Sequence, residues 1–165
     1  MPAKQLIVMR HAKSSWRTSE PDFRRPLSER GTKDAVVAGE VLAEYRIELV
    51  ISSAATRARQ TWQSAEMGGA RSQDVRFTED FYHAWGRDIL AALNRLDDSV
   101  RVVMVLGHEP TMSEVIQILA EPSALLDEIE YKFPTAAIAV LSFEGSWAAL
   151  KDGTATLQRV EIPRG

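Results

Sequence analysis

The stretch LIVMRHAKSS, residues 6–15, decides the fold that this sequence predicts. Its apolar residues form a continuous run, which is typical of a strand buried on both faces of a parallel sheet. Arg10 and His11 follow at once, and charged side chains are rarely found fully buried without a partner. We therefore expect a strand over residues 5–9 that ends where the arginine and the histidine begin.

Similar apolar runs recur along the chain and alternate with helical patterns. A helix that Ser28 caps is expected over residues 28–45, and further helical patterns cover 56–69, 87–96 and 111–120. Extended segments are expected at 48–53, 74–82 and 101–110, and the segments 136–145 and 154–163 are expected to be closing strands, as in a hairpin. The repeated order of strand and helix predicts an α/β fold with a mostly parallel sheet and helices on both faces.

Composition limits the classes of protein to which this chain can belong. Its 165 residues, 45% of them hydrophobic, fit one compact domain over residues 1–165. No apolar run is long enough to cross a bilayer, so no membrane partner is expected. The net charge of -3 argues against nucleic-acid binding, and the lack of cysteine excludes thiolate chemistry. The first residues lack a secretory pattern, so a cytoplasmic location is expected.

Polar clusters follow three of the expected strands. Arg10 and His11 come after the first strand, residues 52–57 with Arg57 after the second, and His108 after the run at 101–106. A single histidine beside a strand is more often a hydrogen-bonded structural residue. In sheets of this kind, however, ligands bind at the carboxyl ends of the strands. Three clusters at the same kind of position therefore indicate one common site.

The motifs LIVMRHAKS, SSAATRARQT and VLGHEP resemble those of the histidine phosphatase superfamily. Within it, RHAKS, the segment RPLSERG and the short chain are most similar to the SixA branch of phosphohistidine phosphatases. The resemblance extends from about residue 6 to about residue 143. It implies a three-layer sandwich with the fold of the phosphoglycerate mutases, without their large insertion above the site.

The resemblance also implies roles for individual residues. His11 would be the nucleophile that accepts the phosphoryl group, and His108 would bind that group and add a further donor if protonated. Arg10 and Arg57 would bind the phosphoryl oxygens, and Ser14 and His83 are further candidates for contacts with the substrate. Neutral imidazole is a good nucleophile, and the planar fork of arginine suits phosphate.

Neither a metal ion nor another cofactor is needed for this chemistry. His11, His83 and His108 are the histidines of the chain, and they lack the close spacing of a zinc motif such as His-Glu-x-x-His. A metal site therefore ranks below a phosphate pocket. Phosphate, sulfate or vanadate is the ligand expected in that pocket.

The sequence departs from the wider family at the general acid. Where many relatives place a glutamate after the third strand, this chain reads EDFYHAW, with His83 near the expected position and Glu79 and Asp80 out of register. A phosphohistidine can carry a proton on its other ring nitrogen, so imidazole leaves without an enzyme acid, whereas an alkoxide needs one. The missing carboxylate therefore favours phosphohistidine as substrate.

The short segment between His83 and the strand before His108 predicts an open, shallow site, which Lys13, Arg17, Arg24 and Arg25 would border. Such a site suits a side chain that protrudes from a protein. The sequence therefore predicts a phosphatase acting through phosphohistidine in the enzyme, with a phosphoprotein as the substrate. A phosphatase for small phosphomonoesters and a phosphate-binding module without turnover remain alternatives.

Overall fold

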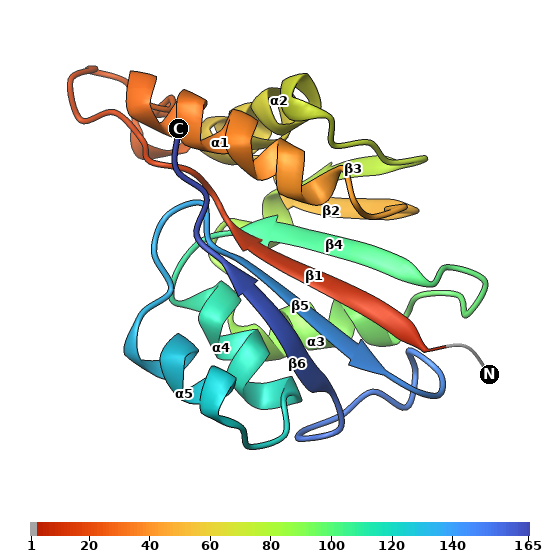
Figure 1. Ribbon diagram of the computed structural model, residues 1–165. Coiled ribbons are helices and arrows are strands. Elements are labelled where there is room, and N and C mark those ends of the chain that lie inside the picture. Colours follow the sequence, from red (N-terminus) through yellow and green to blue (C-terminus); the bar gives the residue numbers. More distant parts are fainter. Residues whose placement is uncertain (1–2) are drawn as a thin grey trace.

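A six-stranded sheet forms the centre of the molecule, for which the computed structural model describes residues 3–165 (Figure 1). The strands lie in the order β3-β2-β4-β1-β5-β6. The first four of these pair in parallel, while β5 runs antiparallel to both of its neighbours. The prediction of a mainly parallel sheet closed by a hairpin is thus confirmed. The strands are β1 (Lys4–Arg10), β2 (Leu49–Ser53), β3 (Val75–Thr78), β4 (Val102–Gly107), β5 (Ile138–Phe143) and β6 (Thr156–Glu161).

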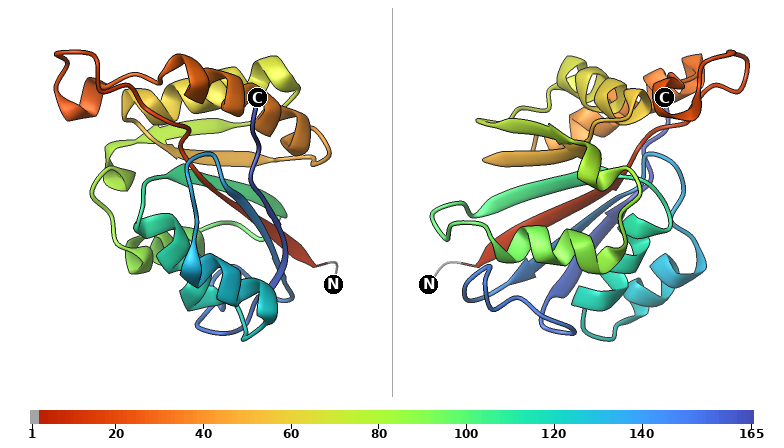
Figure 2. Two further views of the ribbon diagram at one scale, coloured as in Figure 1. Left: turned by 60° about the vertical axis from the view of Figure 1, so that its left-hand side comes forward. Right: turned by 180° about the vertical axis from the view of Figure 1, so that it is seen from behind.

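Helices cover both faces of the sheet and complete the three-layer sandwich (Figure 2). Helices α1 and α2 pack on one face, and α3, α4 and α5 pack on the other. Their bounds are α1 (Glu29–Leu42), α2 (Thr56–Gly68), α3 (Gly86–Asn94), α4 (Thr111–Leu119) and α5 (Ala124–Tyr131). None of the helices within residues 3–165 is both long enough and apolar enough to span a membrane.

Strand β1 owes its continuous apolar run to its place in the middle of the sheet. Ile7 and Met9 pack with α1 and α2, whereas Leu6 and Val8 join the cluster under α3, α4 and α5. Alternate residues of a strand point to opposite faces, so a strand covered on both faces needs apolar residues at every position. The pattern from which the sequence predicted a parallel sheet therefore has this physical origin.

The loop after β1 is fixed against α1 and α2. The hydroxyl of Ser28 accepts a hydrogen bond from the amide of Gly31 and donates one to the carbonyl of Lys13. An added Cβ on Gly31 would lie 2.0 Å from that same carbonyl oxygen, so the close approach requires glycine here. The amide of Ala12 donates to the hydroxyl of Thr61 in α2. These contacts hold residues 11–14 at the carboxyl end of the sheet.

Three local predictions differ from the structure. Residues 79–81 are not extended but form a 3-10 turn, η2 (Glu79–Phe81), because the hydroxyl of Thr78 accepts from the amide of Asp80. Helix α1 ends at Leu42 rather than at residue 45. Helix α5 was not expected, although Ser123 caps it by accepting from the amide of Leu126. Between β3 and β4 the chain forms η2 and α3, so the short connection predicted there is confirmed.

Candidate active site

The carboxyl ends of β1, β2 and β4 meet at a cavity of about 390 Å³, which we call the phosphoryl cavity. Among the predicted site residues, Arg10, His11, Ser14, Arg57 and His108 line it together. His83 does not line it; this exposed residue lies in an adjoining cavity. The remaining residues around the phosphoryl cavity are Lys13, Trp16, Arg25, Glu109 and Thr135.

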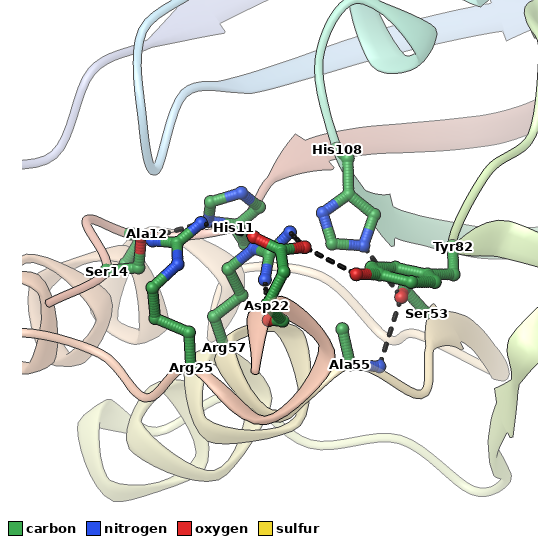
Figure 3. A network of polar contacts seen from close by, with 10 residues as sticks. All are labelled: His11, Ala12, Ser14, Asp22, Arg25, Ser53, Ala55, Arg57, Tyr82 and His108. Carbon is green, nitrogen blue, oxygen red and sulfur yellow. Dashed lines mark hydrogen bonds and ion pairs between the residues drawn. The ribbon is translucent and has the colours of Figure 1, made fainter. Parts of the chain in front are cut away.

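His11 is buried, and one of its two ring nitrogens forms a hydrogen bond within the protein. Its Nδ1 donates a hydrogen bond to the carbonyl oxygen of Ala12 at 2.7 Å, so the unprotonated nitrogen of the neutral ring is Nε2 (Figure 3). Burial lowers the pKa of His11 from 6.5 to about 3, and the nearby charge of Arg57 acts in the same direction. The ring is therefore neutral near pH 7, with a free lone pair on Nε2, which is the form that a nucleophile needs.

His108 stands beside His11, with their ring centroids 5.1 Å apart. Its Nε2 lies 2.8 Å from the hydroxyl oxygen of Ser53, while its Nδ1 is buried and has no partner among the described residues. Figure 3 shows Nδ1 on the side of the ring that faces His11. Burial, followed by the charge of Arg57, lowers the pKa of His108 to about 4. His108 is thus neutral near pH 7 and can donate one proton only.

The hydroxyl of Ser53 indicates where that proton lies. Ser53 is fully buried, and its oxygen already accepts a hydrogen bond from the amide of Ala55 at 3.2 Å. Within residues 3–165 the only acceptor in reach of its own hydroxyl proton is Nε2 of His108. Buried polar groups form hydrogen bonds wherever they can. A hydrogen bond from Ser53 to Nε2 satisfies this hydroxyl, and it corresponds to the tautomer of His108 with its ring proton on Nδ1.

Three arginines leave further donors unused. The Nε atoms of Arg10, Arg25 and Arg57 are buried and lack a partner in the described part of the chain, as does Nδ1 of His108. These four nitrogens are the full set of such buried side-chain atoms found there, and all four residues line the phosphoryl cavity. Each unpaired buried donor costs about 1–3 kcal/mol. The positive charges and the remaining N–H groups of these residues suit a bound anion.

Asp22 contacts two of these arginines, Arg25 and Arg57. Its carboxylate accepts hydrogen bonds from Arg25 and from Arg57, each at 3.1 Å, and a further one from the hydroxyl of Tyr82 (Figure 3). The carbonyl of Asp22 also accepts from Arg57, at 2.7 Å. The bond from Tyr82, followed by those from the arginines, lowers the pKa of Asp22 well below its usual range. Asp22 is therefore ionised and does not act as an acid while these contacts last.

The sequence analysis did not single out Asp22 or assign a role to Ser53 or Trp16. Trp16 is 79% exposed and its ring lies under the guanidinium of Arg25, 3.8 Å from the ring centroid. Of the four basic residues that were expected to border the site, Lys13 and Arg25 line the cavity, and Arg17 and Arg24 do not. Arg25 had been expected at the border of the site because it belongs to the pair of arginines directly before Pro26.

No cluster of three or more histidine, aspartate or glutamate side chains that could hold a metal ion occurs in residues 3–165. His83 is separated from the pair of His11 and His108 by Tyr82, whose ring centroid lies 4.1 Å from that of His83 and 5.6 Å from that of His108. The donors that converge on the cavity are instead guanidinium and imidazole N–H groups, which suit an anion.

The family of the chain follows from comparison with known proteins. The model of the histidine phosphatase superfamily (branch 1) matches residues 6–87, which carry the first two motifs of the site. A candidate phosphohistidine phosphatase SixA from Nakamurella multipartita has a similar structure, with a TM-score of 0.87, 30% identity, and coverage of 99% of this chain and 98% of the other. The chain belongs to the histidine phosphatase superfamily and to its SixA-type branch, and it is therefore a phosphatase, as its motifs predicted.

Two further proteins are similar to this chain. An uncharacterised protein of Mycobacterium tuberculosis is 38% identical over 162 residues, which cover 94% of this chain and all of the relative. The protein histidine phosphatase SixA complexed with tungstate shares the fold at 21% identity, with a TM-score of 0.80 and coverage of 96% of this chain and 97% of the other.

Proposed function

We propose that this protein removes phosphoryl groups from histidine side chains of a phosphoprotein, through a phosphorylated His11. The observation that carries the proposal is the convergence of Arg10, Arg25, Arg57 and His108 on one cavity beside His11. Such a set is suited to the oxygens of a phosphoryl group.

The first step is the attack of His11 Nε2 on phosphorus. Its Nδ1–H remains bonded to the carbonyl of Ala12, which orients the ring. Arg10 and Arg57 bind the equatorial oxygens, where negative charge spreads in the transition state. His108 donates Nδ1–H as a neutral ring, which replaces the expectation that it must be protonated to donate. Ser14 accepts a hydrogen bond from Arg25 and so holds that arginine at the cavity.

The second step returns His11 to its free state. Water attacks the phosphorus of phospho-His11, the bond between phosphorus and Nε2 breaks, and phosphate leaves. Two easier displacements thus replace one difficult hydrolysis. In this proposal neither step uses a metal ion or a cofactor. The proposal also includes a cytoplasmic location, and it includes neither a nucleic-acid partner nor a membrane partner.

Phosphohistidine is preferred to small phosphomonoesters because no carboxyl group at the cavity is placed to donate a proton. Glu109 lines the cavity, but both of its oxygens accept hydrogen bonds from Ser113. The carboxylate of Asp22 is held ionised by Tyr82 and the arginines. Glu79 and Asp80 are exposed on η2 and do not line the phosphoryl cavity. An alkyl phosphate would therefore have to release its alkoxide without protonation, whereas a protonated phosphohistidine releases neutral imidazole.

A single-turnover experiment tests the proposal. The protein is mixed with a radioactive phosphoryl donor and quenched, and the label on the protein is tested for loss in acid. We expect a burst of acid-labile label that His11→Ala abolishes together with turnover. Turnover without label in the wild type, or label that survives in His11→Ala, would move the nucleophile elsewhere. Phosphate binding with neither label nor turnover would indicate a binding module.

A further inference from the structure

A second cavity adjoins the phosphoryl cavity. It has a volume of about 270 Å³, and we call it the aromatic cavity because Tyr82, His83 and Trp85 lie in its wall. His108 and Glu109 line both cavities and so form the boundary between them. His11 lines the phosphoryl cavity only. The two cavities therefore differ in chemistry, with cations around one and rings around the other.

The aromatic cavity lies on the other side of His108 from His11. The ring centroid of His108 is 5.1 Å from that of His11 and 5.6 Å from that of Tyr82, and Figure 3 shows His108 between the two. In a phosphoryl transfer the nucleophile and the leaving group lie roughly in line, on opposite sides of the phosphorus. The leaving group therefore needs a site beside the phosphoryl cavity and away from His11, and the aromatic cavity adjoins it in that way.

The walls of the aromatic cavity suit a planar, positively charged ring. The rings of Tyr82 and His83 lie 4.1 Å apart, and Trp85 is 68% exposed although it is large and apolar. Aromatic faces attract cations and stack on other rings. An exposed tryptophan at a cavity mouth is a common anchor for a bound group.

Glu109 adds a fixed negative charge at the boundary. Its two carboxylate oxygens accept hydrogen bonds from the amide and from the hydroxyl of Ser113, each at 2.7 Å. These bonds fix the carboxylate and leave each oxygen able to accept another. A carboxylate beside a phosphoryl site repels the dianion of an ordinary ester. Its interaction with a leaving group is favourable when that group brings an N–H or a positive charge.

We propose that the aromatic cavity binds the leaving imidazole of a phosphohistidine side chain, and that Glu109 accepts the N–H of the ring nitrogen that is not bonded to phosphorus. The inference rests on the proposed function and names the leaving-group subsite of that same reaction. His11 Nε2 forms a bond to phosphorus while the bond from phosphorus to the substrate nitrogen breaks. The electron pair stays on that nitrogen, and the cationic ring departs as neutral imidazole with its N–H still on Glu109.

A competing role for Glu109 would act through Arg10. The charge of Glu109 favours the protonated form of Arg10, against the burial that lowers the pKa of that guanidinium. If support of Arg10 were its role, loss of the charge would slow every phosphoryl donor alike. The subsite instead predicts effects of opposite sign on donors that carry an N–H and donors that do not.

The test compares kcat/KM of Glu109→Gln for a phosphohistidine peptide and for 4-nitrophenyl phosphate. We expect a loss of roughly 10- to 100-fold for the peptide, the scale of a hydrogen bond to a charged group. The aryl phosphate should react faster than with the wild type, because a repulsive charge is gone. A similar loss on both substrates would assign Glu109 to Arg10 and overturn the subsite.

The two exposed tryptophans provide a matched pair for the aromatic wall. Trp85→Ala should lower the ratio of peptide to aryl phosphate efficiency, because the wall of the aromatic cavity is removed. Trp16→Ala, at the phosphoryl cavity, should change that ratio less. An equal change in both variants would overturn the subsite in favour of general contact with the peptide. Absence of both turnover and labelled His11 in the wild type would instead contradict the proposed function itself.

Discussion

The Nε2 atom of His108 lies 2.8 Å from the hydroxyl oxygen of Ser53, and with Ser53 as donor this contact favours the tautomer that carries the ring proton on Nδ1. Ser53→Ala should remove the preference for that tautomer and lower kcat/KM about tenfold, the scale of one hydrogen bond. Nitrogen NMR of the ring should show Nδ1 protonated in the wild type and a mixture in the variant. Ser53→Thr should restore both signals and rate.

Ser52 provides the control for this variant. It is equally buried and lies next to Ser53, and its hydroxyl donates to the carbonyl of Ser53 rather than to a histidine. Ser52→Ala should therefore leave the nitrogen signals of His108 unchanged. If Ser52→Ala shifted them as much as Ser53→Ala does, the effect would come from the strand and not from the hydroxyl.

Anions that resemble phosphate should stabilise the folded protein, because Arg10, Arg25, Arg57 and His108 gather around one cavity. At about 100 times Kd, a ligand of the native state adds about 2.7 kcal/mol to the free energy of unfolding. Tungstate should thus raise Tm in the wild type and have little effect on Arg57→Ala. Arg87→Ala is the control, since Arg87 is an exposed arginine that pairs with Asp152. Equal loss of the tungstate effect in both variants would refute binding at the cavity.

Arg57→Ala should also slow catalysis by roughly 10²–10⁴, as expected for a positioned charge on a phosphoryl group. The measurement is kcat of wild type, Arg57→Ala and Arg87→Ala with a saturating concentration of 4-nitrophenyl phosphate.

Both site histidines should remain neutral in mildly acidic solution. Their native pKa values of about 3 for His11 and about 4 for His108 lie below the ordinary 6.5, because burial disfavours the charged rings. Between pH 6.5 and about 4, His11 and His108 bind protons in the unfolded chain but stay neutral in the native protein. These two groups therefore make the free energy of unfolding fall as the pH falls. Ring signals in NMR should not titrate between pH 7 and 5; a midpoint near 6.5 for either ring would contradict this.

The rate should depend steeply on the leaving group. Aryl phosphates and a phosphohistidine peptide should react well, and alkyl phosphates should react poorly, by up to the roughly 10²–10⁴-fold that a general acid contributes. The measurement is kcat/KM for the three substrates with wild type and His83→Ala. If His83 were the acid, the variant would be impaired far more on the alkyl phosphate. Comparable wild-type efficiency on all three substrates would defeat the argument from the missing acid.

Gly31→Ala should destabilise the protein, although alanine is the better residue in a helix by about 1 kcal/mol. The new Cβ would meet the carbonyl of Lys13 at 2.0 Å, and the backbone atoms involved cannot move freely. Overpacking of this kind costs about 1–3 kcal/mol. Urea unfolding should show the loss, with Lys33→Ala on the exposed side of the helix as control. A gain in stability would show that the loop accommodates the methyl group.

The sequence predicts the parts of the site that follow from sheet geometry. His11, Arg57 and His108 all stand just beyond strands of one parallel sheet, and the carboxyl ends of parallel strands meet at one edge. Asp22 could not be placed in this way, because it begins a 3-10 turn, η1 (Asp22–Arg24), that is too short to show a periodic pattern. Its contact with Tyr82 joins positions 60 residues apart. Its partners depend on tertiary packing that no local pattern records.

Local structure was hardest to predict where short-range hydrogen bonds decide it. The turn η2 begins because Thr78 bonds the amide of Asp80, so an apparently extended run bends at that point. Helix α5 has only eight residues, of which Ile129 alone is buried. Its Leu125, Leu126 and Ile129 are spaced as in a helix, but eight residues show that period only once.

The four unpaired buried nitrogens lower the stability of the folded protein, so a selection for heat resistance would favour their replacement. Arg10, Arg25 and Arg57 hold guanidinium groups beneath the surface with Nε unsatisfied, so an apolar residue of similar size at one of these positions could raise Tm while it removes activity. Libraries screened for thermal tolerance alone would be expected to accumulate inactive survivors at these three codons. Screening in the presence of tungstate would reverse that bias, because only clones that still bind the anion would gain from it.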